Sequence, residues 1–273
     1  MPSEEKKQEV IHTKIWREEP EPDNPFAAKK CFCAGYDVYG DLLDKASWVE
    51  YLYLLFKLEK PTQEQAKLLE TIAVAISNPG IRDHSVRAAM NAGVGGSTAA
   101  SVLMAALAVG AGQYGGAREV FLVMQLWEEC GQDLEKWEKV LLNPPKEERA
   151  DIWQPMEHPP GFDPNGVSCP APIVQTLKKL ASLSNSNSSL NWLLENQAAL
   201  EKTVDMPIAF TSVAATAFQD LEFSSEQGEM LYLLLRLPGA SAHALEQKYY
   251  GIKKYPFFLN KLHLIDESDP GQP

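Results

Sequence analysis

A glycine-rich turn at residues 110–118 is the part of this sequence best suited to binding a ligand. Its glycines are Gly110, Gly112, Gly115 and Gly116, and an apolar helical segment restarts at Ala117. Glycine adopts positive φ values and lets the backbone approach a ligand closely, and the first N–H groups of a helix attract anions. The turn is not a nucleotide phosphate loop, because no strand precedes it and no Gly-Lys-Ser/Thr follows it. Tight packing of two buried helices is the alternative interpretation.

Two further features could take part in chemistry. His84 follows Asp83 at the start of a predicted helix, where it could donate to a ligand or simply cap the first turn. The segment at residues 143–172 contains eight prolines, which indicates a long irregular loop. Because long loops in compact domains are usually functional or disordered, this segment is a second candidate region.

Most of the chain is predicted to form helices separated by Pro, Gly and Ser/Asn breaks. They cover residues 41–57, 63–77, a segment opening at 82–84, 97–109, 117–130, 134–142, 173–183, 192–204, 208–219, 227–235 and 240–250. Ser47 and Thr62 are predicted N-caps, the latter with Gln65 in a capping box. Residues 97–109 are almost all small or apolar, so we expect a buried helix at the centre of the fold. No β-rich alternating stretch is found, and the predicted fold class is all-α.

The composition of the chain limits the kinds of partner that the protein is expected to bind. The chain has 273 residues, 37 acidic against 25 basic ones and a formal net charge of -12, which opposes general binding to nucleic acid or anionic membranes. Cys31, Cys33, Cys130 and Cys169 form no CxxC pair, and no cleavable signal or bilayer-spanning apolar run is evident. We therefore expect free thiols, a cytoplasmic protein and no metal, with Cys31 and Cys33 as the alternative metal ligands.

Four stretches carry a family resemblance, namely GYDVYGDLLDKASWVEYLYLLFKLEKPTQEQ, GQYGGAREV, PPGFDPNGV and AATAFQDLEFSSEQGEMLYLLLRLPGASAHALEQ. In this order they resemble the citrate synthase superfamily, including its citryl-CoA lyase modules. The resemblance implies an all-helical homodimer without a substantial sheet, whose cleft binds a CoA thioester and an oxo acid. It is consistent with an N-terminal arm at residues 1–34, a large domain at 35–117 and 223–273, and a small domain at 118–222.

The family's catalytic positions carry other residue types in this sequence. Tyr114 stands where the resemblance places a histidine that polarises the thioester carbonyl, and lyase modules commonly have an aromatic residue there. Asp163 and Asn165 replace the histidine and arginine of a second motif. Thr211 stands at the position of the catalytic aspartate, and Asp205 lies six residues earlier, where a register shift would let it substitute.

Other positions keep their family roles under the same resemblance. Arg236 matches an arginine that clamps a substrate carboxylate, a task that suits the guanidinium fork, although a charge at a helix C-terminus is the alternative. His84 corresponds to an oxo-acid-binding histidine. The expected CoA contacts are Gly112, Gly115, Gly116, Ala117 and Arg118.

Claisen-type chemistry needs a base, a donor that stabilises an enolate, and a cation for the carboxylate. The groups available are Tyr114 as donor, Asp163 or Asp205 as base, and Arg236 as clamp. One hypothesis is therefore a CoA-thioester carbon–carbon lyase or synthase acting on a citryl-CoA-like or related oxo-acid substrate, with the CoA thioester as substrate and no tightly bound cofactor. The other is a catalytically silent protein that binds a CoA ester or acid and serves as a partner subunit. The three departures favour the second hypothesis, whereas the retained turn and Arg236 favour the first.

Overall fold

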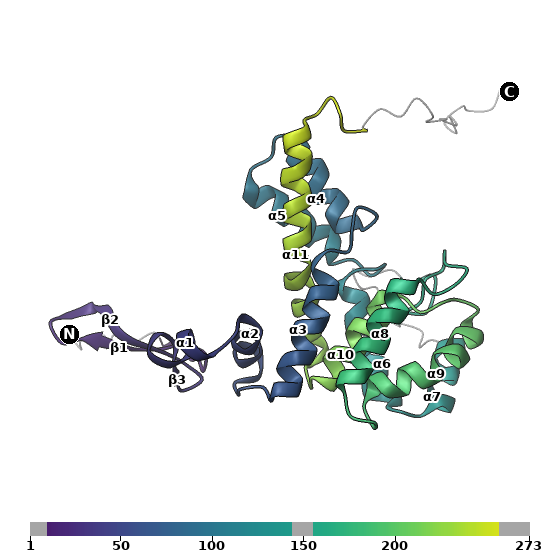
Figure 1. Cartoon of the computed structure of the whole chain (residues 1–273), viewed down its shortest axis with the longest axis horizontal. Helices are drawn as coiled ribbons and strands as arrows, with labels where there is room; N and C mark the ends of the chain where they lie inside the picture. Colours follow the sequence, from purple (N-terminus) through teal and green to yellow (C-terminus); the bar gives the residue numbers. More distant parts are fainter. Residues whose placement is uncertain (1–9, 144–154, 257–273) are drawn as a thin grey trace, which may run out of the picture. The chain divides into compact units, whose positions relative to one another are not determined.

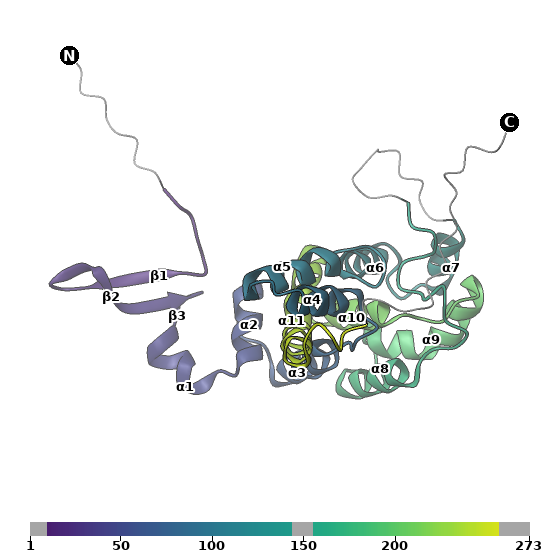
Figure 2. The same cartoon turned by 90° about the horizontal axis from the view of Figure 1, so that it is seen from above.

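The computed structural model describes residues 10–143 and 155–256, and its helices and small sheet are drawn in Figures 1 and 2. Contacts divide the chain into two compact units. Unit 1 comprises Met1–Ser77 and Ala111–Leu235, and unit 2 comprises Asn78–Gly110 and Arg236–Pro273. The boundaries of these units differ from those of the predicted domains, which are a large domain at 35–117 and 223–273 and a small domain at 118–222.

The fold is mainly helical, as predicted, but its N-terminal part contains a small sheet. Strands β1 (Arg17–Glu21), β2 (Asn24–Cys33) and β3 (Tyr36–Asp37) pair antiparallel in the order β1-β2-β3. Strands β1 and β2 lie within the predicted N-terminal arm at residues 1–34 and were not predicted, because the sequence shows no β-rich alternating stretch. These strands are mostly exposed and rich in charge, so they lack the apolar alternation that identifies a half-buried strand.

Capping residues decide where the first helices of unit 1 begin. The predicted helix at 41–57 is divided into a π-helical turn η1 (Val38–Leu42), α1 (Leu43–Lys45) and α2 (Trp48–Lys57). Ser47 and Glu50 form a capping box at the start of α2. The backbone N–H of Gln65 donates to the Thr62 hydroxyl at 3.1 Å, which confirms the predicted cap of α3 (Gln63–Ser77).

The core of unit 1 surrounds helix α10 (Phe210–Asp220), which is buried along its length from Thr211 to Phe218. It packs against α3, α6 (Ala117–Cys130), α8 (Ala171–Leu183) and α9 (Ser189–Val204). Helix α7 (Leu134–Leu142) joins through aromatic contacts in which the Trp127 and Trp137 rings lie 5.0 Å apart. The most deeply buried helix of unit 1 therefore carries Thr211, the residue at the family's aspartate position.

Unit 2 contains α4 (His84–Val94), α5 (Ala99–Gly110) and the C-terminal half of α11 (Ser225–Tyr250). Helix α5 was predicted to be buried on every side, and this expectation is wrong for the isolated chain: Met104 is 60% and Val109 45% exposed. The only residues of α5 that are buried are Val102, Ala106 and Gly110. A unit with so few helices covers one face of α5 and leaves the other open.

Helix α11 continues through Pro238, where two separate helices were predicted. Proline removes one backbone donor and usually kinks a helix. Here both flanks are held by packing, because Leu231 and Leu235 lie in the main core, whereas Ala240 and Ala244 lie in a second apolar cluster. Tertiary contacts therefore override the local signal for a break.

Candidate active site

The candidate site in unit 1 is built around a buried carboxylate, Glu119, in the first turn of α6. Its side chain is 1% exposed. The backbone N–H of Gly115 donates to Glu119 Oε2 at 2.6 Å, and the backbone N–H of Gly161 donates to Oε1 at 2.7 Å. The carboxylate thus links the glycine-rich turn to the proline-rich loop, two segments that were predicted separately as functional regions.

The proline-rich loop lies against the segment that leads into α10. Phe162 and Ile208 form an antiparallel bridge, and the Ala209 N–H donates to the Gly161 carbonyl at 2.8 Å. The Ser212 hydroxyl donates to the same carbonyl at 2.7 Å. Gly161 has φ +89, and a Cβ there would lie 2.9 Å from Val123 Cγ2 and closer still to Ser212 Oγ, so this position requires glycine.

Tyr114 and His158 are brought together at this junction. Tyr114 belongs to the glycine-rich turn and is 43% exposed, whereas His158, three residues before Gly161, is only 9% exposed. Their ring centroids are 5.6 Å apart. His158 Nδ1 lies 3.0 Å from the Pro159 carbonyl oxygen, which favours a proton on Nδ1 and leaves Nε2 as the acceptor in the neutral ring.

Electrostatics at Glu119 combine two opposed effects. Burial raises the pKa of this carboxyl group above its ordinary value. The N–H groups of Gly161 and Gly115, the nearby His158 and the Thr211 hydroxyl favour the ionised form and lower the pKa in turn. Burial is the larger effect, so the pKa of Glu119 stays above its ordinary value even though these partners favour the ionised carboxylate.

The turn residues predicted to contact CoA lie at the N-terminus of α6. Gly115 has φ +67, and Gly116 is the N-cap, with no side-chain cap hydrogen bond. Ala117 is buried, and the Arg118 guanidinium lies 4.1 Å from the centroid of the Phe121 ring. Gly112 is half-buried in the same turn. The glycine turn therefore leads directly into the N-terminus of a 14-residue helix.

The carboxylates predicted as bases have other partners. Asp163 Oδ1 accepts the N–H of Asn165 at 2.9 Å within its own turn, and its backbone N–H donates to the Pro207 carbonyl. Asn165 is exposed. Asp205 is exposed and ends α9 in the left-handed conformation, with φ +55. Thr211 is 2% exposed in the first turn of α10, beside Glu119.

In unit 2, Arg236 forms an ion pair with Asp83. The guanidinium donates to Asp83 Oδ2, and the two side chains are 5% and 14% exposed. Asp83 Oδ1 also caps α4 by accepting the N–H of Ser85 at 2.9 Å and that of Val86 at 3.2 Å. His84 is the exposed first residue of α4. In this structure a carboxylate of the chain itself therefore holds the predicted clamp.

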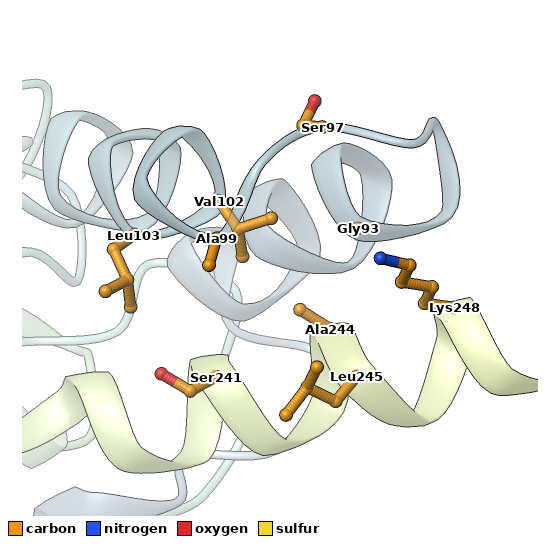
Figure 3. A pocket seen from close by; sticks show the side chains of 9 residues that line it. All are labelled: Gly93, Ser97, Ala99, Val102, Leu103, Ser241, Ala244, Leu245 and Lys248. Atoms are coloured by element: carbon orange, nitrogen blue, oxygen red, sulfur yellow. The ribbon is translucent and has the colours of Figure 1, made fainter.

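A separate apolar hollow lies in unit 2, with a volume of about 270 Å³ (Figure 3). Its lining consists of Gly93, Ser97, Ala99, Val102, Leu103, Ser241, Ala244, Leu245 and Lys248. Figure 3 shows the Lys248 side chain extending from α11 toward Gly93 on α4. None of the residues predicted to bind substrate or CoA lines this hollow.

The remaining predictions concern thiols, metals and membranes. All four cysteines are free thiols, as expected. Over residues 10–143 and 155–256, no cluster of His, Cys, Asp and Glu side chains suited to a metal ion was found. Within the same ranges, no helix combines the length and the apolar character needed to cross a membrane.

Sequence reasoning missed Glu119 and His158. Glu119 follows Tyr114 by five residues, and His158 precedes PPGF directly, so both lie next to motifs that were recognised. A Glu in the first turn of a helix is ordinarily exposed to solvent, and its negative charge interacts favourably with the helix dipole. The signal that could have found it is its place on the apolar face of α6, between the buried residues Gly116 and Val120.

The order and packing of these elements identify the fold: the chain has the mainly helical citrate synthase fold. It is similar to citryl-CoA lyase from Hydrogenobacter thermophilus, with a TM-score of 0.71 and 15% identity over 97% of this chain and 98% of that one. It is also similar to ATP citrate lyase from Methanothrix soehngenii in complex with citrate and coenzyme A, with a TM-score of 0.71 and 19% identity over 96% of this chain and 43% of that one.

A third similar structure is citrate synthase from the archaeon Thermoplasma acidophilum, in ternary complex with carboxymethyl coenzyme A and oxaloacetate. The TM-score is 0.52 and the identity 17%, over 74% of this chain and 53% of that one. No protein-family model and no curated protein sequence matches the chain. At these identities the likeness concerns the fold, and the chemistry has to be argued from the chain's own residues.

Proposed function

We propose that the protein binds a CoA thioester and a small carboxylic acid, and that it cleaves or forms the carbon–carbon bond between them. The observation that carries this proposal is the convergence on Glu119 of the glycine-rich turn, the proline-rich loop and the start of α10. These segments supply a helix N-terminus, a tyrosine and a histidine at one place. The similar structures that contain coenzyme A with citrate or oxaloacetate support the same ligand classes.

In the cleavage direction, His158 Nε2 takes the proton of the substrate hydroxyl while the carbon–carbon bond breaks. The electron pair of that bond moves onto the thioester as an enolate, which the Tyr114 hydroxyl stabilises by donation. The enolate carbon then takes up a proton to give the acyl thioester, and the former alcohol leaves as an oxo acid. Asp163 is less suited to this task, because its carboxylate caps its own turn.

Arg236 and His84, both of which belong to unit 2, are proposed to bind a small carboxylic acid. A substrate carboxylate would have to compete with Asp83 for the guanidinium. The same ion pair favours a second candidate function, in which the chain binds a CoA ester without catalysis and serves as a partner subunit. Conversion of citryl-CoA to acetyl-CoA and oxaloacetate by the purified protein distinguishes the two functions.

Ligand binding is tested by thermal stability. Acetyl-CoA or CoA at about a hundred times its dissociation constant should stabilise the native protein by about 2.7 kcal/mol, because a ligand that binds only the folded state shifts the unfolding equilibrium. The ligand-dependent stabilisation should vanish in Gly115→Val, because valine disfavours φ +67 and would change the backbone of the turn. No atom lies within 4 Å of the added Cβ, so the effect would come from the backbone conformation and not from a collision. Scanning calorimetry with each ligand measures both effects.

Gly131→Val is the matched control, because Gly131 has φ +53, open space around its Cβ and a place at the opposite end of the same helix. This variant should melt at a lower temperature but keep the full ligand shift. A ligand shift that survives in Gly115→Val, or that is absent from the parent, contradicts CoA binding at this turn.

We also propose that the protein acts as a homodimer in the cytoplasm. Unit 2 exposes Met104 (60%), Val109 (45%) and Leu245 (68%), which a second copy would cover. Light scattering is expected to give twice the mass of 30.3 kDa, and Met104→Lys should shift the equilibrium toward the monomer because it would bury a charge. A parent protein that is monomeric at all concentrations contradicts the dimer.

A further inference from the structure

Glu119 is buried where an apolar side chain would fill the space at lower cost. Removing a carboxylate from water is unfavourable unless both oxygens find donors. Here each oxygen has one, the Gly115 N–H at 2.6 Å and the Gly161 N–H at 2.7 Å. Hydrogen bonds to a charged acceptor are stronger than neutral ones. The specific contribution of this carboxylate is therefore the link between its own glycine-rich turn and the backbone of Gly161, which lies 42 residues beyond Glu119.

The two bonds lie directly beside the ring pair of the site. Tyr114 precedes Gly115, and His158 lies three residues before Gly161. The ring centroids are 5.6 Å apart, and each ring belongs to one of the two linked segments. The Gly161 end is itself fixed, because its carbonyl accepts from Ser212 Oγ and from the Ala209 N–H. Through Glu119, the glycine-rich turn is thus fastened to a backbone that α10 already holds.

We propose that Glu119 is the positioning residue of this site, holding the turn at 112–118 against the loop at 158–167 so that Tyr114 and His158 meet the thioester as a fixed pair. This role rests on the proposed function. The positioning role requires two hydrogen-bond acceptors on one side chain, one for the Gly115 N–H and one for the Gly161 N–H. Glutamine offers a single carbonyl oxygen, and its amide nitrogen would face a backbone donor.

The test compares Glu119→Gln with Glu128→Gln, an exposed glutamate on the same helix. In Glu119→Gln, one of the Gly115 and Gly161 amides should exchange with deuterium about ten-fold faster or more, because it loses its acceptor. Acetyl-CoA affinity should fall by a similar factor, and turnover of citryl-CoA should fall by up to about a hundred-fold through misplacement of the rings. Glu128→Gln should match the parent in all three measurements.

Glu119→Asp retains both oxygens on a shorter stem and should recover part of the affinity lost in Glu119→Gln. If Glu119→Gln fails to fold, Glu119→Asp is compared with the parent, and unchanged exchange at both amides would overturn the proposal. Parent-like exchange or parent-like acetyl-CoA affinity in a folded Glu119→Gln would overturn it as well. If the parent itself binds no CoA, the proposed function fails. Deuterium exchange at the Gly115 and Gly161 amides then tests by itself whether Glu119 links the turn to the loop.

Discussion

Asp83→Asn is expected to lower the free energy of unfolding by about 3 kcal/mol, the scale found when one partner of a buried ion pair is removed. The Arg236 and Asp83 side chains are 5% and 14% exposed, so the ion pair between them would be lost in a nearly dry setting. Asparagine is as good an N-cap as aspartate and can still accept the N–H groups of Ser85 and Val86. The loss should therefore come from the charge, and urea denaturation followed by circular dichroism measures it.

Asp133→Asn is the matched control for this effect. Asp133 caps α7 in the same way, by accepting the N–H of Lys136, but its side chain is 45% exposed and its ion pair with Lys136 spans 3.8 Å. An exposed pair contributes roughly 0 to 1 kcal/mol, so this variant should unfold nearly like the parent. Equal effects of the two substitutions would show that the buried pair adds nothing beyond the cap.

The same variant addresses the role of Arg236. If the guanidinium binds a substrate carboxylate, Asp83 competes with that carboxylate, and its neutralisation should make citrate or oxaloacetate stabilise Asp83→Asn more than they stabilise the parent. If Arg236 only anchors α11 to the start of α4, acids should leave the melting temperature of Asp83→Asn unchanged. The second result would favour the non-catalytic partner function.

Gly161→Ala is expected to cost about 2 to 5 kcal/mol and to abolish the CoA-dependent stabilisation. Two terms add at this position. The left-handed region costs an L-residue roughly 1 to 2 kcal/mol, and overpacking costs about 1 to 3 kcal/mol. The backbone has φ +89, and the added Cβ would collide with Ser212 Oγ and approach Val123 Cγ2 to 2.9 Å. A backbone shift that relieves the collision would also move the Gly161 N–H away from Glu119.

Gly35→Ala separates these two terms. Gly35 has φ +87, nearly the same backbone conformation, but nothing lies within 4 Å of its added Cβ. Only the conformational cost of roughly 1 to 2 kcal/mol should remain, with full binding of acetyl-CoA. Thermal melting with and without acetyl-CoA compares the two variants. Equal destabilisation in both would mean that the close packing around Gly161 is not a constraint.

Most helices of this protein could be predicted because their limits are set locally. Helices α3 and α7 begin and end at the predicted residues, Gln63–Ser77 and Leu134–Leu142. The signals that limit these helices involve residues close together in the sequence, namely the caps at Thr62 and Asp133 and the break at Asn78-Pro79-Gly80. The helical pattern predicted an all-α protein, and the resemblance of four stretches of the sequence predicted the citrate synthase fold.

The composition of the site was decided by tertiary structure instead. Glu119 and Gly161 are 42 residues apart, and Asp83 and Arg236 are 153 residues apart, so no periodic pattern in the sequence connects them. Burial of Glu119 depends on the loop that covers it, and burial in turn makes its two hydrogen bonds significant. Asp163 and Asp205, which were predicted as bases, lie in a turn and at a helix end, and their partners there could not be read from residue type. Residue type is a property of the chain alone, whereas charge, access and partners arise only when distant segments meet.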